Sequence, residues 1–178
     1  MTEGRIDRLD RAADAALEPL RRNRAAAALF GAASRVGDFS VVWHVTGLVR
    51  AVGSTTRLRE AVFLSCALGA ESLVVNQGIK RMFRRERPTA SGDDRFGLRT
   101  PSTSSFPSGH ASSATFAVIV LVGFAGWPLS WLFVAIGTVV ALSRAVVRIH
   151  HMSDIIGGIA VGAVLGAVAR AAASAVLR

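Results

Sequence analysis

The sequence predicts an all-α fold, in which about four to five helices cross a membrane as a bundle and an amphipathic helix precedes them. Hydrophobic residues make up 51% of the 178 residues. Residues 111–142 and 155–169 contain no charged side chain, and about 20 apolar residues suffice to cross a bilayer. The composition therefore indicates an integral membrane protein, with residues 1–178 forming one domain.

The N-terminal segment, residues 1–37, is expected to lie at the membrane surface. Apolar side chains recur there at spacings of three and four, with Arg and Asp between them: Ile6, Leu9, Ala13, Leu17 and Leu20. This pattern predicts an amphipathic helix over residues 5–24. The helix can lie in the membrane interface or pack, solvated, on its own domain, and the sequence leaves both open.

Three apolar segments of different character follow. Residues 25–34 are too short to cross a bilayer, and residues 39–53 form a short span or half of a longer, broken one. Residues 61–83 are predicted to form a helix that becomes polar toward its end, where Pro88 prevents continuation. A polar loop rich in turn residues is expected over 89–107.

The C-terminal half is predicted to form helices over residues 108–126, 128–148 and 153–173. In the last of these, small residues recur every four positions, a stripe that lets membrane helices approach closely: Gly158, Gly162 and Gly166. Because consecutive spans cross in opposite directions, the joins at 83–108 and 148–153 are expected on the same membrane face.

Charge and cysteine content exclude other classes. The net charge of +9 could suggest nucleic-acid binding, but the basic residues flank apolar spans, and no soluble domain remains to carry a binding face. No nucleic-acid partner is therefore expected. The single cysteine, Cys66, allows no intramolecular disulfide.

Polar chemistry gathers in three clusters at these joins. The first is "KRMFRRERP" (80–88), in which Lys80 and Arg87 are seven residues apart and are expected to share one helix face. Lys80 is the only lysine of the chain. The remaining arginines of the cluster are interpreted as a positive membrane flank: Arg81, Arg84 and Arg85.

The second cluster is "SFPSGHASS" (105–113). Pro107 suits a first helical position, and Ser108 and Gly109 leave unpaired backbone N–H groups that attract an anion to the start of a helix. His110 in that first turn could donate a proton. Taken alone, the segment is equally compatible with an ordinary serine-rich helix start and an incidental histidine.

The third cluster is "SRAVVRIHHMSD" (143–154). Arg144 offers a bidentate fork for a phosphate-like oxyanion. His150 and Asp154 are four residues apart, a separation at which a carboxylate can hold Nδ1–H of an imidazole and leave Nε2 as a nucleophile or base. The alternative is a pair of interfacial histidines beside a helix that Asp154 caps.

Together, the clusters resemble the type-2 phosphatidic acid phosphatase and vanadium haloperoxidase superfamily. Its signature is K-x6-R-P, P-S-G-H and S-R-x5-H-x3-D, and every spacing is kept from Lys80 to Asp154. The resemblance covers roughly residues 60–165, the motif-bearing core. The N-terminal third of the chain carries no motif.

The resemblance implies a role for each matched residue. His150 would be the nucleophile that takes the phosphoryl group, Asp154 would orient it, and His110 would protonate the leaving oxygen. The remaining matched residues would hold the phosphate oxygens: Lys80, Arg87, Ser108, Gly109 and Arg144. Neutralising charge on these oxygens is most of what phosphoryl transfer requires, so the resemblance implies neither a metal nor another cofactor.

The expected function is metal-independent hydrolysis of a lipid phosphate or pyrophosphate by a multi-pass protein of the cell membrane. Phosphatidate, phosphatidylglycerophosphate and polyprenyl phosphates or diphosphates are the substrate classes that the resemblance suggests. The sequence leaves open the oligomeric state and the membrane face that holds the site.

Three other functions use the same residues. The first is vanadate-dependent halide oxidation, but the relatives with this activity are larger and soluble, and this chain has neither property. A metal site could form from His110, His150, His151 and Asp154, although the neighbouring cations would repel a metal. A non-catalytic lipid-binding protein is the third alternative.

Two polar residues within apolar segments complete the candidates. Glu71 is expected to face the bundle interior, because a carboxylate within a membrane span is costly, and Asn76 is its expected partner. His44 is expected to have a structural role.

Overall fold

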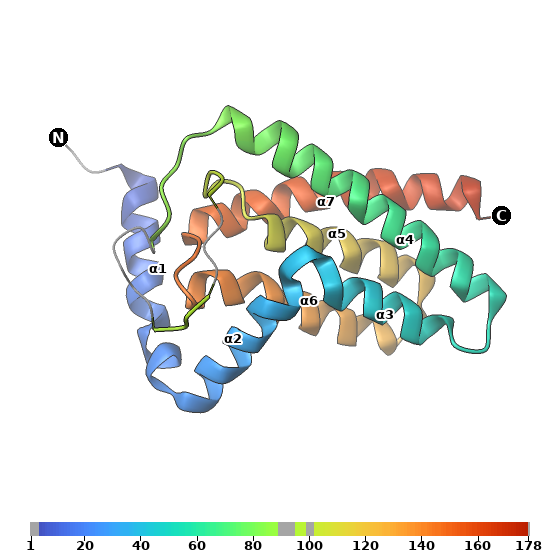
Figure 1. Cartoon of the computed structure of the whole chain (residues 1–178), viewed down its shortest axis with the longest axis horizontal. Helices are drawn as coiled ribbons and strands as arrows, with labels where there is room; N and C mark the ends of the chain where they lie inside the picture. Colours follow the sequence, from blue (N-terminus) through green and yellow to red (C-terminus); the bar gives the residue numbers. More distant parts are fainter. Residues whose placement is uncertain (1–3, 89–94, 99–101, 178) are drawn as a thin grey trace.

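The computed structural model describes residues 4–88, 95–98 and 102–177, and all regular structure among them is helical. The elements are α1 (Arg5–Arg22), α2 (Arg24–Gly37), α3 (Val41–Ala51), α4 (Thr55–Leu73), α5 (Gly109–Phe124), α6 (Leu129–Val146) and α7 (Met152–Val176). Figure 1 shows α3 to α7 running along the long axis, with α1 lying across one end. The prediction of an all-α bundle is confirmed.

Large apolar side chains cover the outside of the bundle as well as its core. The core packs around Trp43, Leu64 and Phe133, which are almost fully buried. On the outer surface Leu48, Val164 and similar residues remain exposed. Since lipid tails solvate apolar side chains as readily as a protein core does, this outer face suits a bilayer.

By length and composition, three helical stretches among the described residues can cross a membrane: Arg24–Ala51, Leu129–Val146 and Met152–Val176. The apolar helix α5 is shorter. Trp127 and Trp131 stack edge to face at the end opposite α1, where aromatic side chains suit the membrane interface. The number of crossings, about four to five, stays a prediction.

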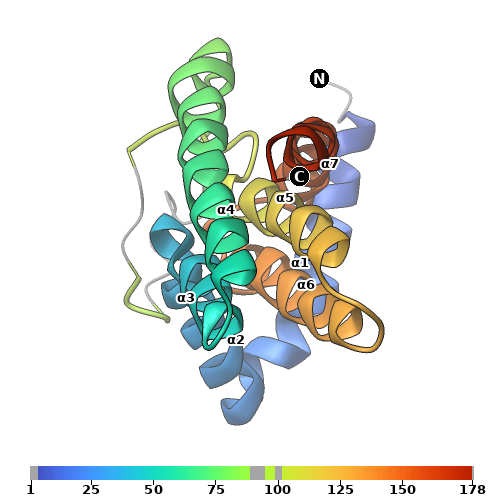
Figure 2. The same ribbon diagram turned by 90° about the vertical axis from the view of Figure 1, so that its right-hand side faces the viewer.

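Helix α5 lies in the middle of the bundle when the molecule is viewed along its axis (Figure 2), and α7 packs directly against its backbone. A Cβ on Gly162 would lie 2.2 Å from the carbonyl oxygen of Ser112, and one on Gly158 would lie 2.5 Å from that of Ser108. The glycine stripe predicted from the sequence is therefore the surface along which these two helices meet.

We expect Gly162→Ala to lower the free energy of unfolding by about 1–3 kcal/mol, because the new methyl group must push α7 away from α5. A lower Tm of the detergent-solubilised protein would show this. Gly69→Ala is the matched control, since Gly69 is exposed on α4 and a Cβ there meets nothing within 4 Å. Equal Tm values for the two variants would contradict this account of the interface.

The segments 25–34 and 39–53 form one broken helical stretch. Helix α2 and α3 are joined by the 3-10 turn η1 (Asp38–Ser40), in which Phe39 and Ser40 have φ values of 53° and 59°. These left-handed residues bend the chain. Residues 39–53 are therefore half of a longer, broken helical stretch, which is one of the two forms predicted for them. Residues 25–34, which are too short to cross a bilayer by themselves, belong to the other half.

The predicted helix 61–83 begins earlier and ends differently. Helix α4 starts at Thr55, then widens into the π-helical η2 (Val74–Gly78) and tightens into the 3-10 helix η3 (Ile79–Met82). From Phe83 the backbone is extended. The prediction that Lys80 and Arg87 share a helix face is therefore wrong, because no helix joins them.

Helix α1 packs on its own domain, which is one of the two arrangements considered for it. Asp10 and Arg21 are buried against the body of the protein. The guanidinium of Arg21 donates to the carbonyl oxygens of Ala145 and Val146, where a cation satisfies the free carbonyls at the end of α6. Ile6, Leu9 and Leu20 remain exposed. Leu17 of the apolar face packs against the buried cluster that contains Ala145 and Ile155. The helix is thus attached through both polar and apolar contacts, and it presents its other large apolar side chains outward.

Candidate active site

The short loop between α6 and α7 places His150 against Asp154 at the start of α7. Nδ1 of His150 lies 3.5 Å from Oδ2 of Asp154. The hydroxyl of Ser105 lies 3.3 Å from the same Nδ1 and donates to the same carboxylate oxygen. His150 and Asp154 are almost completely buried. The pairing predicted from the four-residue spacing is therefore present, with Ser105 as an additional member.

The contact between Arg87 and His150 determines the histidine tautomer. Nη1 of Arg87 lies 3.1 Å from Nε2 of His150. A guanidinium can only donate, so Nε2 accepts with its lone pair and the ring hydrogen is on Nδ1. This is the arrangement in which the carboxylate side holds Nδ1–H and Nε2 is free to act as a nucleophile.

Burial lowers the pKa of His150 below its ordinary value, because the charged form would lose its solvation. The hydrogen bond of Asp154 opposes this shift, and the positive charge of Arg87 adds to it. His150 is therefore neutral at physiological pH, in agreement with the tautomer.

Three buried cations come from η3, from the non-helical segment that follows it and from α6. Arg87 follows η3 and is held by the carbonyl oxygens of Thr103 and Ser104 at 3.1 and 3.2 Å. Arg144, on α6, donates to the hydroxyl of Ser34. Lys80, on η3, is 6% exposed.

One buried nitrogen of this group has no partner. Nε of Arg144 has no hydrogen-bond partner in the described part of the chain. An unsatisfied buried donor is costly, and a bound anion would satisfy it.

The start of α5 lies beside these cations. The backbone N–H of Ser108 donates to the carbonyl oxygen of Asp154 at 3.0 Å, so the prediction that this N–H is unpaired is wrong. Ser108 caps the helix, and its hydroxyl accepts from the backbone N–H of Ala111 at 3.4 Å. Pro107 therefore precedes the cap rather than occupying the first helical position. A Cβ on Gly109 would lie 3.8 Å from Nζ of Lys80. The missing side chain thus leaves space next to Lys80 at the positive end of the helix dipole.

His110 lies in the first turn of α5 and faces the α2–η1 junction. Its Nε2 lies 3.1 Å from the carbonyl oxygen of Ser34 and 3.2 Å from Oδ1 of Asp38. Both partners are acceptors, so Nε2 carries a hydrogen. Neither Ser34 nor Asp38 was predicted from the sequence, because the N-terminal segment carries no motif.

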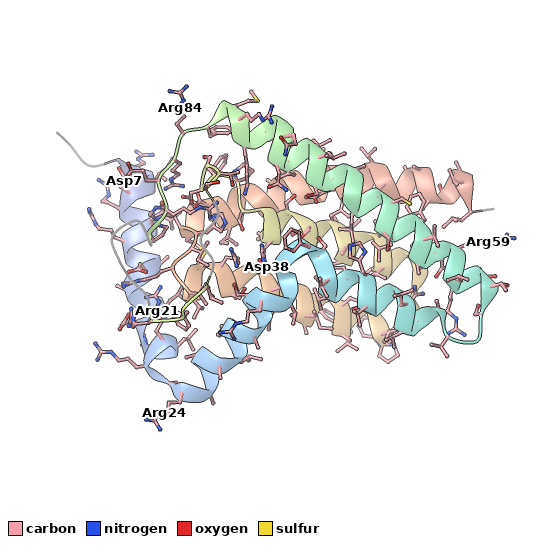
Figure 3. All side chains as sticks on the ribbon, in the orientation of Figure 1. Asp7, Arg21, Arg24, Asp38, Arg59 and Arg84 are labelled. Atoms are coloured by element: carbon pink, nitrogen blue, oxygen red, sulfur yellow. The ribbon has the colours of Figure 1, made fainter. Side chains whose placement is uncertain are left out.

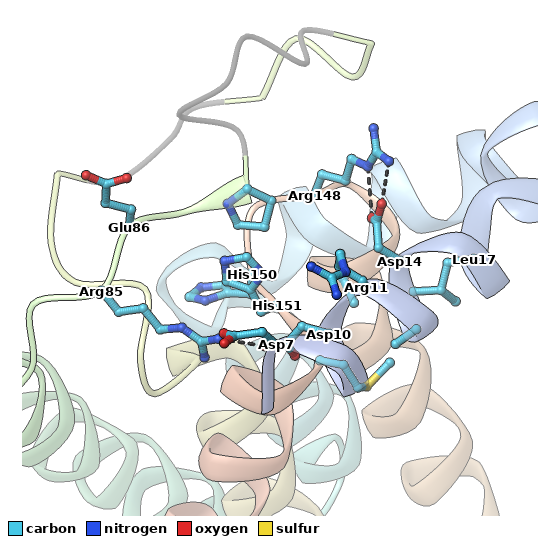
Figure 4. A pocket seen from close by; sticks show the side chains of 14 residues that line it. Asp7, Asp10, Arg11, Asp14, Leu17, Arg85, Glu86, Arg148, His150 and His151 are labelled. Atoms are coloured by element: carbon cyan, nitrogen blue, oxygen red, sulfur yellow. Dashed lines mark hydrogen bonds and ion pairs between the residues drawn. The ribbon is translucent and has the colours of Figure 1, made fainter. Parts of the chain in front are cut away.

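Two cavities meet at His150. The inner cavity, of about 310 Å³, is lined by the side chains of Lys80, His110, Arg144 and His150 and by the start of α5. The second, called here the α1 cavity, measures about 500 Å³ and lies between α1 and the α6–α7 loop (Figure 4). Charged residues of both signs line both cavities. The inner cavity is the one suited to an anion, because Lys80 and Arg144 line it and Nε of Arg144 has no partner in the described residues.

Comparison with known proteins identifies the family of the chain. The family model of the PAP2 superfamily matches residues 60–177, which is more than half of the chain. The chain belongs to the PAP2 superfamily. This family comprises phosphatases of lipid phosphates, and the prediction of an enzyme of this class is confirmed.

Curated relatives are also similar over most of the chain. A decaprenylphosphoryl-5-phosphoribose phosphatase of Mycobacterium tuberculosis is 35% identical over 136 residues, which cover 76% of this chain and 73% of that protein. The protein of the same name from Mycolicibacterium smegmatis is 38% identical over 129 residues, covering 71% and 68%.

A solved structure shows the same fold. It is a transmembrane PAP2-type phosphatidylglycerolphosphate phosphatase from Bacillus subtilis, with a TM-score of 0.53 and 17% identity. The match covers 94% of this chain and 97% of that one. At this identity the likeness shows the fold alone, and it agrees with the predicted helical bundle.

The sequence interpretation of Arg85 as a membrane flank is wrong. Nη1 of Arg85 donates to Oδ1 of Asp154 at 2.5 Å, and Nη2 donates to Oδ2 of Asp10 at 2.6 Å. The same Asp10 carboxylate accepts from the backbone N–H and the hydroxyl of Ser153, both at 2.8 Å. Figure 4 shows Arg85 reaching from the loop toward α1. Helix α1 is thereby connected to the carboxylate that faces His150.

Arg85 holds the second carboxylate oxygen of Asp154. We therefore expect Arg85→Gln to lower kcat by about 10- to 100-fold, the equivalent of one charge-assisted hydrogen bond. Arg84→Gln is the control, since Arg84 is exposed and points away from the bundle (Figure 3). The measurement is steady-state phosphate release at equal protein concentration. Similar rates for the two variants would mean that Arg85 has no part in positioning Asp154.

The remaining polar predictions are settled by contacts. Glu71 is buried, as expected, but its partner is the hydroxyl of Ser112 rather than Asn76. The amide of Asn76 donates to Ser72 instead. Nδ1 of His44 lies 2.9 Å from the hydroxyl of Ser65 on α4, which fits the structural role predicted for it.

Proposed function

We propose that this PAP2 protein hydrolyses a phosphate monoester carried by a polyprenyl-linked sugar, as part of the cell membrane and within a single domain of residues 1–178. The observation that carries the proposal is the neutral, buried His150, whose Nε2 lone pair lies beside buried cations and the start of α5. The sugar phosphate follows from the two curated relatives, which are named for such a substrate.

In the first step, Nε2 of His150 attacks phosphorus, and the bond from phosphorus to the leaving oxygen breaks. Lys80, Arg87 and Arg144, with the hydroxyl of Ser108 and the backbone N–H of Gly109, bind the three oxygens on which charge accumulates. Arg87 already donates to Nε2, so the phosphate takes over this N–H as it arrives.

His110, protonated on both ring nitrogens beside Asp38, supplies the proton that the leaving alkoxide needs and is left as the neutral imidazole. In the second step, water attacks the phosphohistidine, His110 accepts its proton, and inorganic phosphate leaves with His150 neutral again. Asp154 and Ser105 hold Nδ1–H throughout, which stabilises the positive charge that develops on the ring.

The test is phosphate release by the purified protein from polyprenylphosphoryl-ribose 5-phosphate, phosphatidate, phosphatidylglycerophosphate and a polyprenyl diphosphate. The sugar phosphate should be the best substrate. Activity should survive EDTA and be blocked by vanadate, which can adopt the trigonal bipyramidal geometry of the transition state. Activity that EDTA abolishes and a divalent metal restores would favour a metal site instead, and no phosphate release from any lipid would favour the non-catalytic alternative.

A further inference from the structure

Part of the inner cavity is lined by polar side chains that the proposed chemistry does not use. They come from α4 and η2, from η1 and from α5: Glu71, Ser72, Asn76, Asp38, Ser40 and Ser113. Carboxylate, amide and hydroxyl groups in one small cavity are unusual beside the apolar side chains of a membrane bundle. Their chemistry therefore indicates a polar ligand rather than a lipid tail.

Glu71 is the member of this group whose burial is most costly. It is 4% exposed, and one carboxylate oxygen, Oε1, accepts from the hydroxyl of Ser112. In the described part of the chain, Oε2 has no hydrogen-bond partner. A nearly buried carboxylate with a free acceptor on a cavity wall is prepared to accept from a ligand donor.

Asn76 is brought beside the phosphate-binding elements by a local change of helix type. It lies in the π-helical η2, a geometry that is rare and often occurs at functional sites. Its Oδ1 lies 3.6 Å from the position that a Cβ on Gly109 would take, and Nζ of Lys80 lies 3.8 Å from the same position. The amide is therefore next to the start of α5, where the phosphate would bind.

The leaving group would lie on this side of the phosphate. His110, which would protonate the leaving oxygen, lines the same cavity as Glu71 and Asn76. The cavity measures about 310 Å³, at the small end of ligand pockets. It suits a compact group such as a pentose next to the phosphate.

We propose that Glu71 and Asn76 form a hydroxyl-binding subsite that selects a polyhydroxylated leaving group over a plain alkyl one. The carboxylate accepts from sugar hydroxyls, and the amide can both donate and accept. A leaving group without hydroxyls would leave the buried Glu71 carboxylate oxygen unpaired, which is the strongest basis for rejecting an analogue. The Glu71 carboxylate would also repel the second phosphate of a diphosphate. The inference rests on the proposed phosphatase function and names the residues that set its substrate class.

The experiment compares ribose 5-phosphate with pentyl phosphate, which have the same number of carbon atoms. For the parent protein in detergent, we expect kcat/KM to favour ribose 5-phosphate by about 100-fold or more. Glu71→Gln keeps an acceptor for Ser112, and Asn76→Ala removes the amide. Each variant should reduce the preference by about tenfold, the equivalent of one hydrogen bond to a buried group, while pentyl phosphate hydrolysis and inhibition by vanadate stay unchanged.

Gln77→Ala is the matched control, because Gln77 is the next residue of η2 and is exposed. It should leave the preference as in the parent. Comparing each variant with the parent cancels the different intrinsic reactivities of the two esters.

The outcomes separate the subsite from the function. Equal efficiency of the parent on both esters, or equal losses on both in the variants, would overturn the subsite while the phosphatase function stands. If neither ester nor any lipid phosphate is hydrolysed, the proposed function fails and this inference fails with it. A lower Tm with an unchanged preference would show that Glu71 serves only to hold Ser112.

Discussion

His150→Ala should lower kcat by about 10⁴-fold or more on every substrate, because it removes the nucleophile rather than a group that assists it. The loss should be the same for a lipid monoester and for nitrophenyl phosphate, since no leaving group is reactive enough to replace the attacking imidazole. The measurement is phosphate release by the parent and the variant at saturating substrate.

The neighbouring histidine provides the control. His151 follows His150 directly, and its backbone N–H donates to Oδ2 of Asp154 at 2.9 Å. His151→Ala keeps this N–H and should therefore retain activity. Equal losses in the two variants would show that the adjacent histidines act through the folding of the loop and not through the chemistry of His150.

Arg144→Lys should lower kcat by about two orders of magnitude, as expected when a donor to the transition state is lost from a preorganised site. The guanidinium of Arg144 donates from Nη1 to the hydroxyl of Ser34 and leaves Nε without a partner in the described residues. A planar fork can hold Ser34 and a phosphate oxygen at once, whereas an ammonium group on a flexible stem is a single point charge.

The matched control for this substitution is Arg84→Lys, at the exposed arginine that points away from the bundle (Figure 3). The two variants carry the same chemical change, so their kcat values are directly comparable. If both retain parental activity, Arg144 is not a phosphate ligand. If both lose activity equally, the loss is not specific to the site.

Much of the fold could be predicted because its signals are local. The expected helices 108–126, 128–148 and 153–173 correspond to α5, α6 and α7 within a few residues, since uncharged stretches bounded by Pro, Gly and charged residues define their ends. The pairing of His150 with Asp154 agrees with their four-residue spacing, although only Asp154 lies in α7. The expectation that the joins at 83–108 and 148–153 lie on the same membrane face follows from counting how often the predicted helices cross the membrane.

The contacts that the sequence did not reveal are long-range. Arg85 and Asp154 are 69 residues apart, and Ser105 and His150 are 45 apart. An arginine next to an apolar span is typical of a membrane flank. Only the three-dimensional structure therefore distinguishes the role of Arg85 from that of Arg84. Asp10 had no distinguishing signal, because a carboxylate in an amphipathic helix is usually solvated. The π-helical turn of η2 likewise depends on packing and not on a residue pattern.

The central claim is that the phosphoryl group passes through His150, and trapping the intermediate tests it most directly. The parent protein is mixed with a substrate labelled in the transferred phosphate, quenched in alkali within the first turnovers, and digested for peptide mapping. We expect label on the peptide that contains His150, stable in alkali and released in acid as a phosphohistidine requires. His150→Ala should retain none. Label on His110, or rapid turnover with no protein-bound phosphate at any time, would contradict the account.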